Sequence, residues 1–88
     1  MMTNFKNFNR HKCFDEKMFN HFSTVKKDID DWAMFEEVKI SSFSNSLFGI
    51  WDGYLYDGLV DTAKELGVPG FLVYRLEKVV KHIENSVS

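Results

Sequence analysis

The chain has 88 residues, of which 44% are hydrophobic, 16% aromatic and 27% charged. A chain of this length folds as one small domain, and this composition excludes a disordered tail, a collagen-like fibre and a disulfide scaffold. The 11 basic and 13 acidic residues give a net charge of −2. That balance argues against a strongly basic protein that coats nucleic acid.

The same residues indicate where the protein acts. A single cysteine, Cys13, forms no internal disulfide bond and so favours a reducing compartment. No apolar run approaches the ~18 residues that a membrane span requires. The stretch from Met1 to Lys12 is polar and lacks the apolar segment of a signal peptide. We therefore expect a cytoplasmic protein without a membrane partner.

The first half of the chain predicts an arm followed by helix. Residues 1–13 hold Phe5 and Phe8 among polar residues, which predicts an irregular N-terminal arm pinned to the body by these two rings. From Phe14 onward apolar residues recur every three or four positions, which predicts helix over about 14–39. This stretch is either one kinked helix or two short ones. A second helix would start at Ser23-Thr24 or within Asp28–Asp31, because Ser, Thr and Asp are good helix caps.

The middle of the chain allows two interpretations. Residues 41–46 are rich in serine, which predicts a loop with Ser44 or Asn45 as the cap of the next helix. Residues 46–57 carry helically spaced apolar residues, but Gly49, Gly53 and Gly58 each disfavour a helix by about 1 kcal/mol relative to alanine. Asp52-Gly53 is also a typical two-residue hairpin turn. A helix and a β-hairpin therefore both remain for this stretch.

The last third of the chain is helical. A helix over 58–66 is expected to end at Gly67, with a turn at Val68-Pro69-Gly70 and a terminal helix to about residue 84. The predicted fold is thus a single mainly α domain over residues 1–88. It is a small bundle of three to four helices, with a β-hairpin at 47–57 as the α+β alternative.

Three kinds of chemistry find no support in the residue pattern. His11 and Cys13, with His21 and His82 far away in sequence, lack the paired short spacings of a zinc site. Cys13 lies near two histidines, but no third orienting group or oxyanion loop accompanies them. Adjacent carboxylates such as Asp30-Asp31 point to different parts of a helix surface. We expect no enzyme activity, no metal site and no cofactor.

One group of residues is typical of a protein-binding surface. Three carboxylates recur every four positions and would line one face of a helix, about 6 Å apart: Asp57, Asp61 and Glu65. Three aromatic residues precede them: Trp51, Tyr54 and Tyr56. Aromatic side chains anchor protein interfaces, and a row of charges steers a partner of opposite charge. A solvated helix face is the alternative interpretation of the carboxylate row.

A second group of residues suggests contact with DNA. Ala63 stands in one predicted helix, Leu66-Gly67-Val68 form a turn, and Val73 and Leu76 lie on the inner face of the next helix. On these residues the segment 62–76 resembles the helix-turn-helix pattern of DNA-binding regulators. In that family the turn glycine has a positive φ and the second helix enters the major groove.

The resemblance has consequences and departures. It implies DNA contacts by four residues of the second helix: Tyr74, Arg75, Lys78 and Lys81. The segment departs from the pattern at Thr62, where an aliphatic residue is usual, and at Phe71 and Leu72, where polar residues are usual. Residues 59–88 carry four basic and four acidic side chains. Because affinity for DNA rests mostly on neutralising phosphates, such a neutral segment is a weak binder.

Together these residues predict a small non-enzymatic binding protein. Its most concrete form is an inhibitor or neutraliser that covers a basic surface of a partner protein, similar in size and charge to immunity proteins, antitoxins and phage-encoded host inhibitors. The alternative is a helix-turn-helix transcriptional regulator. A homodimer formed through Phe71, Leu72 and the aromatic residues is a third interpretation, since exposed apolar clusters often mark subunit contacts.

Overall fold

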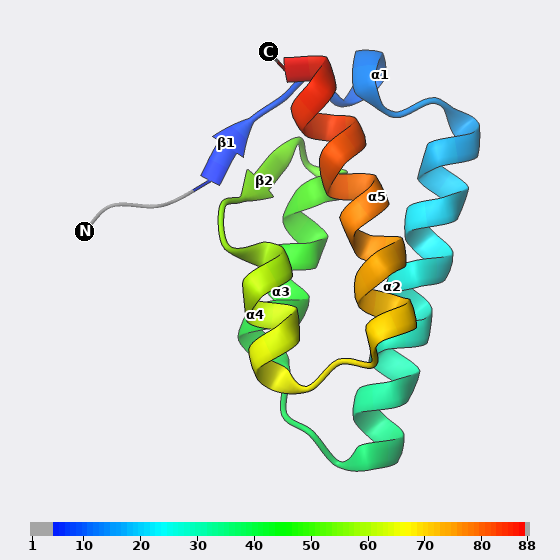
Figure 1. The fold of residues 1–88 in the computed structure, drawn as a ribbon. Coiled ribbons are helices and arrows are strands. Elements are labelled where there is room, and N and C mark those ends of the chain that lie inside the picture. Colours follow the sequence, from blue (N-terminus) through cyan, green and yellow to red (C-terminus); the bar gives the residue numbers. More distant parts are fainter. Residues whose placement is uncertain (1–4, 88) are drawn as a thin grey trace.

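The computed structural model describes residues 5–87, which form five helices and two short strands (Figure 1). In chain order the elements are β1 (Phe5–Asn7), α1 (Arg10–Cys13), α2 (Glu16–Glu36), α3 (Ser41–Trp51), β2 (Tyr54–Tyr56), α4 (Leu59–Leu66) and α5 (Gly70–Val87). The prediction of a mainly α domain is confirmed. The bundle has more helices than expected because the predicted arm contributes the single turn α1.

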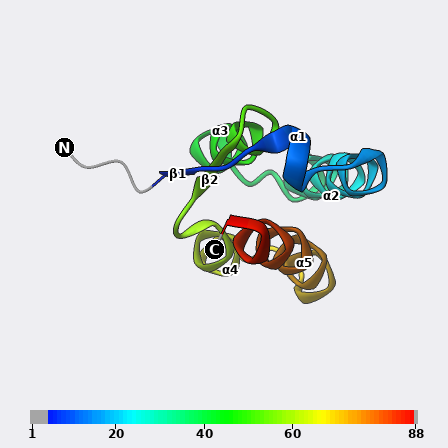
Figure 2. The same ribbon diagram turned by 90° about the horizontal axis from the view of Figure 1, so that it is seen from above.

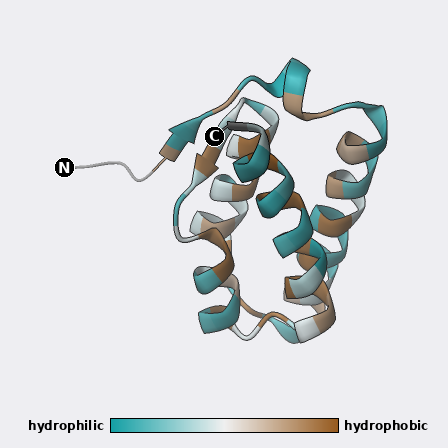
Figure 3. Cartoon of the chain, turned by 45° about the horizontal axis from the view of Figure 1, so that its top comes forward, coloured by the Kyte–Doolittle hydropathy of each residue, from teal (hydrophilic) through white to brown (hydrophobic). Residues whose placement is uncertain are grey.

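The four longer helices pack in two layers around one core. Seen from above, α2 and α3 lie in one layer and α4 and α5 in the other (Figure 2). Hydrophobic and hydrophilic stretches alternate along each helix (Figure 3), so that each turns an apolar face to the core. All four helices contribute side chains that are almost completely buried: Phe22, Val25 and Ile29 from α2, Leu47 and Ile50 from α3, Leu59 and Ala63 from α4, and Leu76, Val79 and Ile83 from α5.

The stretch predicted as one kinked or two short helices is one helix of 21 residues, α2. Asp15 caps its start, where the carboxylate accepts the backbone N–H of Met18 at 2.8 Å. The hydroxyls of Ser23 and Thr24 donate to carbonyl oxygens one turn earlier, at 2.9 and 3.0 Å. Because these hydroxyls already bond within the helix, they do not cap a second one.

The other predicted starting point within this helix, residues 28–31, uses its carboxylates in ion pairs. The three pairs have N–O distances of 2.6, 2.9 and 2.8 Å: Asp30 with Lys26, Asp31 with Lys27, and Asp28 with Arg75 of α5. The hydrogen bond that Lys27 donates to Asp31, together with the charge of that carboxylate, raises the pKa of Lys27. These contacts leave the aspartates no role as caps and hold α2 together as one helix.

The loop predicted over 41–46 is wrong. These residues form the first half of α3, whose cap position is Ile40 rather than Ser44 or Asn45. Phe43, Leu47 and Ile50 repeat at helical spacing and are 3% exposed or less. Burial of this apolar stripe outweighs the local preference of serine for loops.

The sheet is small and joins distant parts of the chain. Beyond α3 the chain turns at Asp52-Gly53, and residues 54–56 form β2. This turn joins a helix to a strand and not two strands of a hairpin within 47–57. Helix and strand thus both occur within 46–57. The partner of β2 is β1, in antiparallel register with Phe5 opposite Tyr56. The prediction of an irregular arm is therefore wrong for residues 5–13, and residues 1–4 lie outside the described part.

The three glycines that disfavour a helix over 46–57 make room for this pairing. A Cβ at Gly49 would lie 3.6 Å from the Phe5 ring, and one at Gly58 would lie 3.4 Å from the Tyr56 ring. Gly53 has a φ of +87°, and a Cβ there would approach the carbonyl oxygen of Phe8 to 2.9 Å. The same segment is tied by a 2.8 Å hydrogen bond from the Phe8 N–H to the Gly53 carbonyl. Phe8 is buried, as the pinning role predicted for it requires.

The remaining elements agree with the sequence. α4 ends at Gly67, which has a φ of +87° and closes the helix with backbone hydrogen bonds to Ala63 and Lys64. Pro69 precedes α5, which continues to Val87, beyond the predicted end at residue 84. No helix within residues 5–87 combines the length and the apolar character needed to cross a membrane.

Substitution of Gly53 by alanine tests the packing of the N-terminal segment. We expect Gly53→Ala to lower the free energy of unfolding by about 1–3 kcal/mol, because alanine is strained at this φ and its methyl group collides with a backbone oxygen. Urea denaturation measures the change. Gly70→Ala is the control: nothing lies within 4 Å of its added Cβ, so we expect equal or slightly higher stability. Equal effects of the two variants would contradict the packing described.

Candidate protein-binding surface

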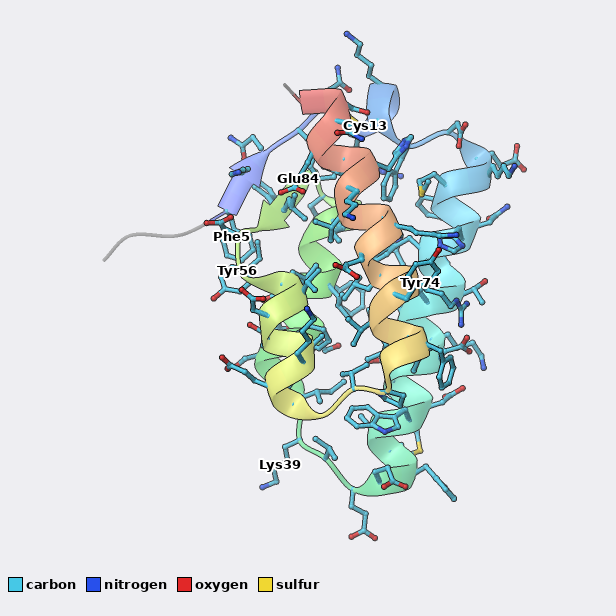
Figure 4. The ribbon with its side chains drawn as sticks, in the orientation of Figure 1. Phe5, Cys13, Lys39, Tyr56, Tyr74 and Glu84 are labelled. Atoms are coloured by element: carbon cyan, nitrogen blue, oxygen red, sulfur yellow. The ribbon has the colours of Figure 1, made fainter. Side chains whose placement is uncertain are left out.

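The aromatic part of the predicted surface comes from β2 and its partner strand. Alternation along β2 turns Leu55 into the core, 3% exposed, and Tyr54 and Tyr56 to the other side. Tyr54 is 47% exposed and Tyr56 is half-buried. Phe5 of β1 joins them, 40% exposed, with its ring centroid 5.3 Å from that of Tyr56. Figure 4 shows Phe5 and Tyr56 side by side at one edge of the molecule.

The carboxylates of the predicted row do not all lie on one helix. Asp57 belongs to the turn before α4, Asp61 to the first turn of α4, and Glu65 to its last turn, and all three are exposed. Asp57 and Asp61 line a groove of about 250 Å³ between β2, α4 and α5. Glu65 is not among the residues that line this groove, although it follows Asp61 by one turn on the same side of α4.

Helix α5 completes the groove with residues that the sequence did not indicate. Glu77 and Glu84 line it from α5, and Glu84 lies between that helix and the strands (Figure 4). Lys64 and Lys81 also line it, so four carboxylates face two ammonium groups. Glu77 and Glu84 were not assigned to this surface from the sequence because they belong to another helix. The one signal in the sequence is their spacing of seven residues, which is two helical turns and places both on the same face of α5. We call this groove, together with Phe5, Tyr54, Tyr56 and Glu65, the acidic aromatic face.

Trp51, which the sequence predicts as an anchor, lies apart from the groove. It is half-buried at the end of α3 and packs edge-on against the Phe22 ring of α2, with centroids 5.1 Å apart. The Phe48 ring lies 5.1 Å away on its other side. Its indole Nε1 is buried and has no hydrogen-bond partner among the described residues. A side chain packed between two helices in this way stabilises the fold and is not free to enter a partner.

The helix-turn-helix candidates do not form one free surface on α5. Arg75 donates to Asp28 of α2 at 2.8 Å, and its side chain is only 28% exposed. Tyr74 is exposed, and the Lys78 ammonium group lies 4.8 Å from the centre of its ring. Lys81 lines the acidic groove. Arg75, the residue with the most suitable donor geometry for DNA, is thus paired within the chain.

Residues with metal or nucleophilic chemistry lie apart from this surface. Within the described part of the chain, no three His, Cys, Asp or Glu side chains are grouped so that they would hold a metal ion. Cys13 is buried, and its carbonyl oxygen is 2.6 Å from His82 Nε2, which must carry the proton. His82 and Cys13 therefore fasten α1 to α5.

Comparisons with known proteins give no indication of what this surface binds. The chain has no significant match to a protein-family model, to a curated protein or to a solved structure. The contacts and charges of the described residues therefore carry the functional argument.

A double-mutant cycle tests the structural role of Arg75. We expect Arg75→Ala and Asp28→Ala to destabilise the fold by similar amounts and the double variant to lose less than the sum. The coupling energy should be about 0.5–1 kcal/mol, as for other partly exposed ion pairs. Urea denaturation of the four proteins measures it. A coupling of zero would mean that Arg75 is free to bind elsewhere.

Proposed function

We propose that the protein is a small non-enzymatic binding protein that acts in the cytoplasm. It inhibits or neutralises a partner protein by covering a basic surface of that partner with the acidic aromatic face. The observation that carries this proposal is the pairing of β1 with β2. It holds the exposed Phe5 ring against Tyr56, which lines a groove with four carboxylates, and it places the exposed Tyr54 on the same strand as Tyr56.

The aromatic side chains supply the affinity in this proposal. Phe5 and Tyr54 are 40% and 47% exposed, although both pack against the backbone of Gly49. Because the Phe5 ring lies close to Gly49 and 5.3 Å from the Tyr56 ring, it loses little conformational freedom when a partner covers it. Large aromatic residues that are held in this way are typical interface hot spots, and truncation of one costs about 2 kcal/mol or more.

In this proposal the carboxylates orient the partner and raise its association rate. Glu77 and Glu84 add to the predicted row, and the groove has an excess of two negative charges, equal to the formal net charge of the whole chain. A basic partner is therefore attracted toward this edge of the molecule rather than to its surface in general. Such steering raises the association rate, and its strength falls as salt concentration rises.

A regulator that binds DNA is the second candidate. The observation that favours it is the αL conformation of Gly67 between α4 and α5, the geometry that the helix-turn-helix resemblance implies for that glycine. Two observations favour the protein partner more strongly. Arg75 is paired with Asp28, and Glu77 and Glu84 of α5 would repel phosphates.

The proposal is tested by affinity capture of the tagged protein from lysate of its own cells, with and without nuclease. We expect one protein to be retained in near-stoichiometric amount after nuclease treatment. Loss of all bound material on nuclease treatment would overturn the proposal in favour of the DNA-binding alternative.

Charge reversal on the captured pair tests the surface itself. We expect Asp57→Lys, Asp61→Lys and Glu65→Lys together to slow association by tenfold or more at low salt, by the usual range of steering effects. Stopped-flow or surface plasmon resonance gives the rates. The control carries three carboxylate-to-lysine changes at exposed positions of α2 and its C-cap, Glu16, Glu36 and Glu37, and should change the rate far less. Equal rates for the two variants would exclude the acidic aromatic face as the binding site.

Truncation of the aromatic side chains tests their contribution to affinity separately from the contribution of the carboxylates to the association rate. We expect Tyr54→Ala to weaken binding by about 2 kcal/mol, chiefly through faster dissociation. Phe48→Ala is the control, because Phe48 is comparably exposed at 51% but packs on the Trp51 side of α3. Isothermal titration calorimetry measures both. A larger loss from Phe48→Ala would move the binding site to the other side of the helix.

A further inference from the structure

A second pocket lies at the end of the bundle where α2 begins and α5 ends (Figure 1). It has a volume of about 320 Å³ and shares no lining residue with the acidic groove. Small-molecule sites in proteins usually measure about 300–1,000 Å³, so that this pocket has room for a small organic molecule. We call it the basic pocket, and its lining residues are Asp15, Lys17, Met18 and His21 from the start of α2, and Lys78 and His82 from α5.

The charged groups of the basic pocket favour an anion. Lys17 and Lys78 line it from two different helices, and neither forms an ion pair with a carboxylate of the described residues. The one carboxylate of the lining, Asp15, accepts the backbone N–H of Met18 at 2.8 Å and so caps α2. With both histidines neutral, the lining has two positive charges and one negative charge, although the whole chain has a net charge of −2. This local excess of positive charge attracts a negatively charged ligand.

His21 offers a hydrogen-bond donor that the chain itself does not use. Its Nε2 is buried and has no hydrogen-bond partner within residues 5–87. A proton on that nitrogen would be a buried donor without an acceptor, so that the neutral ring holds its proton on Nδ1 instead. No group of the described residues accepts this proton either. The Nδ1–H group is therefore available to a ligand in the pocket that His21 lines.

His82 provides a further donor once an anion is present. Its Nε2 donates to the carbonyl oxygen of Cys13 at 2.6 Å, so that Nδ1 of the neutral ring carries no proton. A negative charge in the pocket favours the protonated ring, in which Nδ1 donates as well. The two imidazoles thus add hydrogen bonds to the charge of the two lysines, as a tightly held anion requires.

Met18 determines what else the ligand contains. Its half-buried side chain packs against the core and gives the pocket an apolar wall. A ligand that fits therefore combines an anionic group with an apolar part. A phosphate monoester offers several donors three oxygen atoms and about two negative charges, whereas a carboxylate has two oxygen atoms and a single charge.

We propose that the basic pocket binds a small organic phosphate. The two lysines and the two imidazoles hold the phosphate group, and the organic part lies against Met18. Because this site shares no residue with the acidic groove, the inference does not rest on the proposed function, and its test needs no partner protein. The phosphates of DNA are the competing occupant, since the helix-turn-helix resemblance assigns Lys78 to DNA. A small molecule is favoured because the half-buried His21 and Met18 contribute to this site as much as the exposed lysines do.

An NMR titration of the isotope-labelled full chain tests the proposal with three probes: phenyl phosphate, phenol and inorganic phosphate. We expect phenyl phosphate to shift the backbone signals of residues 15–21 and 78–82 in a saturable manner. It should bind about tenfold more tightly than either of the other two probes, because it alone combines the charge with an apolar ring.

Four outcomes of this titration would overturn the proposal. Shifts that do not saturate, or that centre on the acidic groove, would exclude binding of a phosphate in the basic pocket. Equal affinities for phenyl phosphate and inorganic phosphate would indicate an adventitious ion only. Equal affinities for phenyl phosphate and phenol would exclude a role of the charge. A DNA duplex that shifts the same signals where phenyl phosphate does not would favour the DNA-binding alternative.

Two lysines of α5 give a matched pair of variants. We expect Lys78→Ala to raise the dissociation constant of phenyl phosphate about tenfold, because it removes a charged donor from the pocket. Lys81→Ala is the control, because Lys81 is also exposed on α5 but lines the acidic groove. Both variants change the net charge by the same amount, and circular dichroism checks that both fold. Equal dissociation constants would mean that the overall charge attracts the ligand, which would overturn the proposal.

Replacement of His21 separates binding from stability. We expect His21→Leu to leave the free energy of unfolding equal or higher, because it removes a buried nitrogen without a partner. The same variant should raise the dissociation constant of phenyl phosphate several-fold, since the Nδ1–H donor is lost. Urea denaturation and the NMR titration measure the two effects. An unchanged dissociation constant would contradict the arrangement of donors proposed for this pocket.

Discussion

Packing of residues 5–8 across the turn that follows α3 is the contact on which the exposed surface depends. The Phe8 ring is buried, its N–H bonds the carbonyl of Gly53, and Gly53 holds a left-handed conformation directly against it. These contacts align β1 with β2. The register then decides that Leu55 points inward and that Tyr54 and Tyr56 point outward.

Without that pairing the same aromatic residues would lie on a flexible connection between α3 and α4. A three-residue strand has little stability of its own, and an unpaired segment would lose conformational entropy on binding. The conformational entropy is lost during folding instead, because Gly49 lets the Phe5 ring and the Cβ of Tyr54 lie close to α3, and Gly58 lets the Tyr56 ring lie close to the turn before α4. The glycines that make this region a poor helix therefore make it a well-ordered surface.

Helix α2 determines where Trp51 lies, through the buried side chain of Lys26. On one side Lys26 is buried, bonds Asp30 at 2.6 Å and has its ammonium group 4.3 Å from the centre of the Phe48 ring. The Trp51 ring lies 5.7 Å from the same group. A carboxylate and two aromatic faces offset the cost of removing this charge from water. Trp51 is thus drawn toward α2, which explains why the largest aromatic side chain near β2 is not part of the binding surface.

Much of the helical fold could be predicted because its signals are local. The apolar spacing of α2, the positive-φ glycine after α4 and the turn before α5 each lie within a few residues of one another. The start of α3 could not be predicted in this way, because burial of Phe43 and Leu47 against other helices outweighs the preference of the serines for loops. The residues that pair between β1 and β2 lie 47 to 51 positions apart in the sequence, so that no local pattern indicates this pairing.

The candidate site shows the same division between local and distant signals. Tyr54, Tyr56, Asp57 and Asp61 were found because they lie within eight consecutive residues that share one edge of the fold. Phe5, Glu77 and Glu84 were not assigned to it, because only the packing of β1 and α5 brings them there. Trp51 lies apart from the groove for the converse reason: it is a neighbour in sequence, but it is the last residue of α3 and packs against Phe22 of α2.

The packing of α5 also bears on the choice between a protein partner and DNA. A helix-turn-helix regulator would read DNA with the exposed side of α5 that carries Tyr74, Arg75 and Lys78. On that side Arg75 is already held by Asp28, and the Lys78 ammonium group lies 4.8 Å from the centre of the Tyr74 ring. Arg75 would have to give up its ion pair before it could contact a base or a phosphate. The ion pair of Arg75 therefore favours the proposed function through the acidic aromatic face over DNA binding.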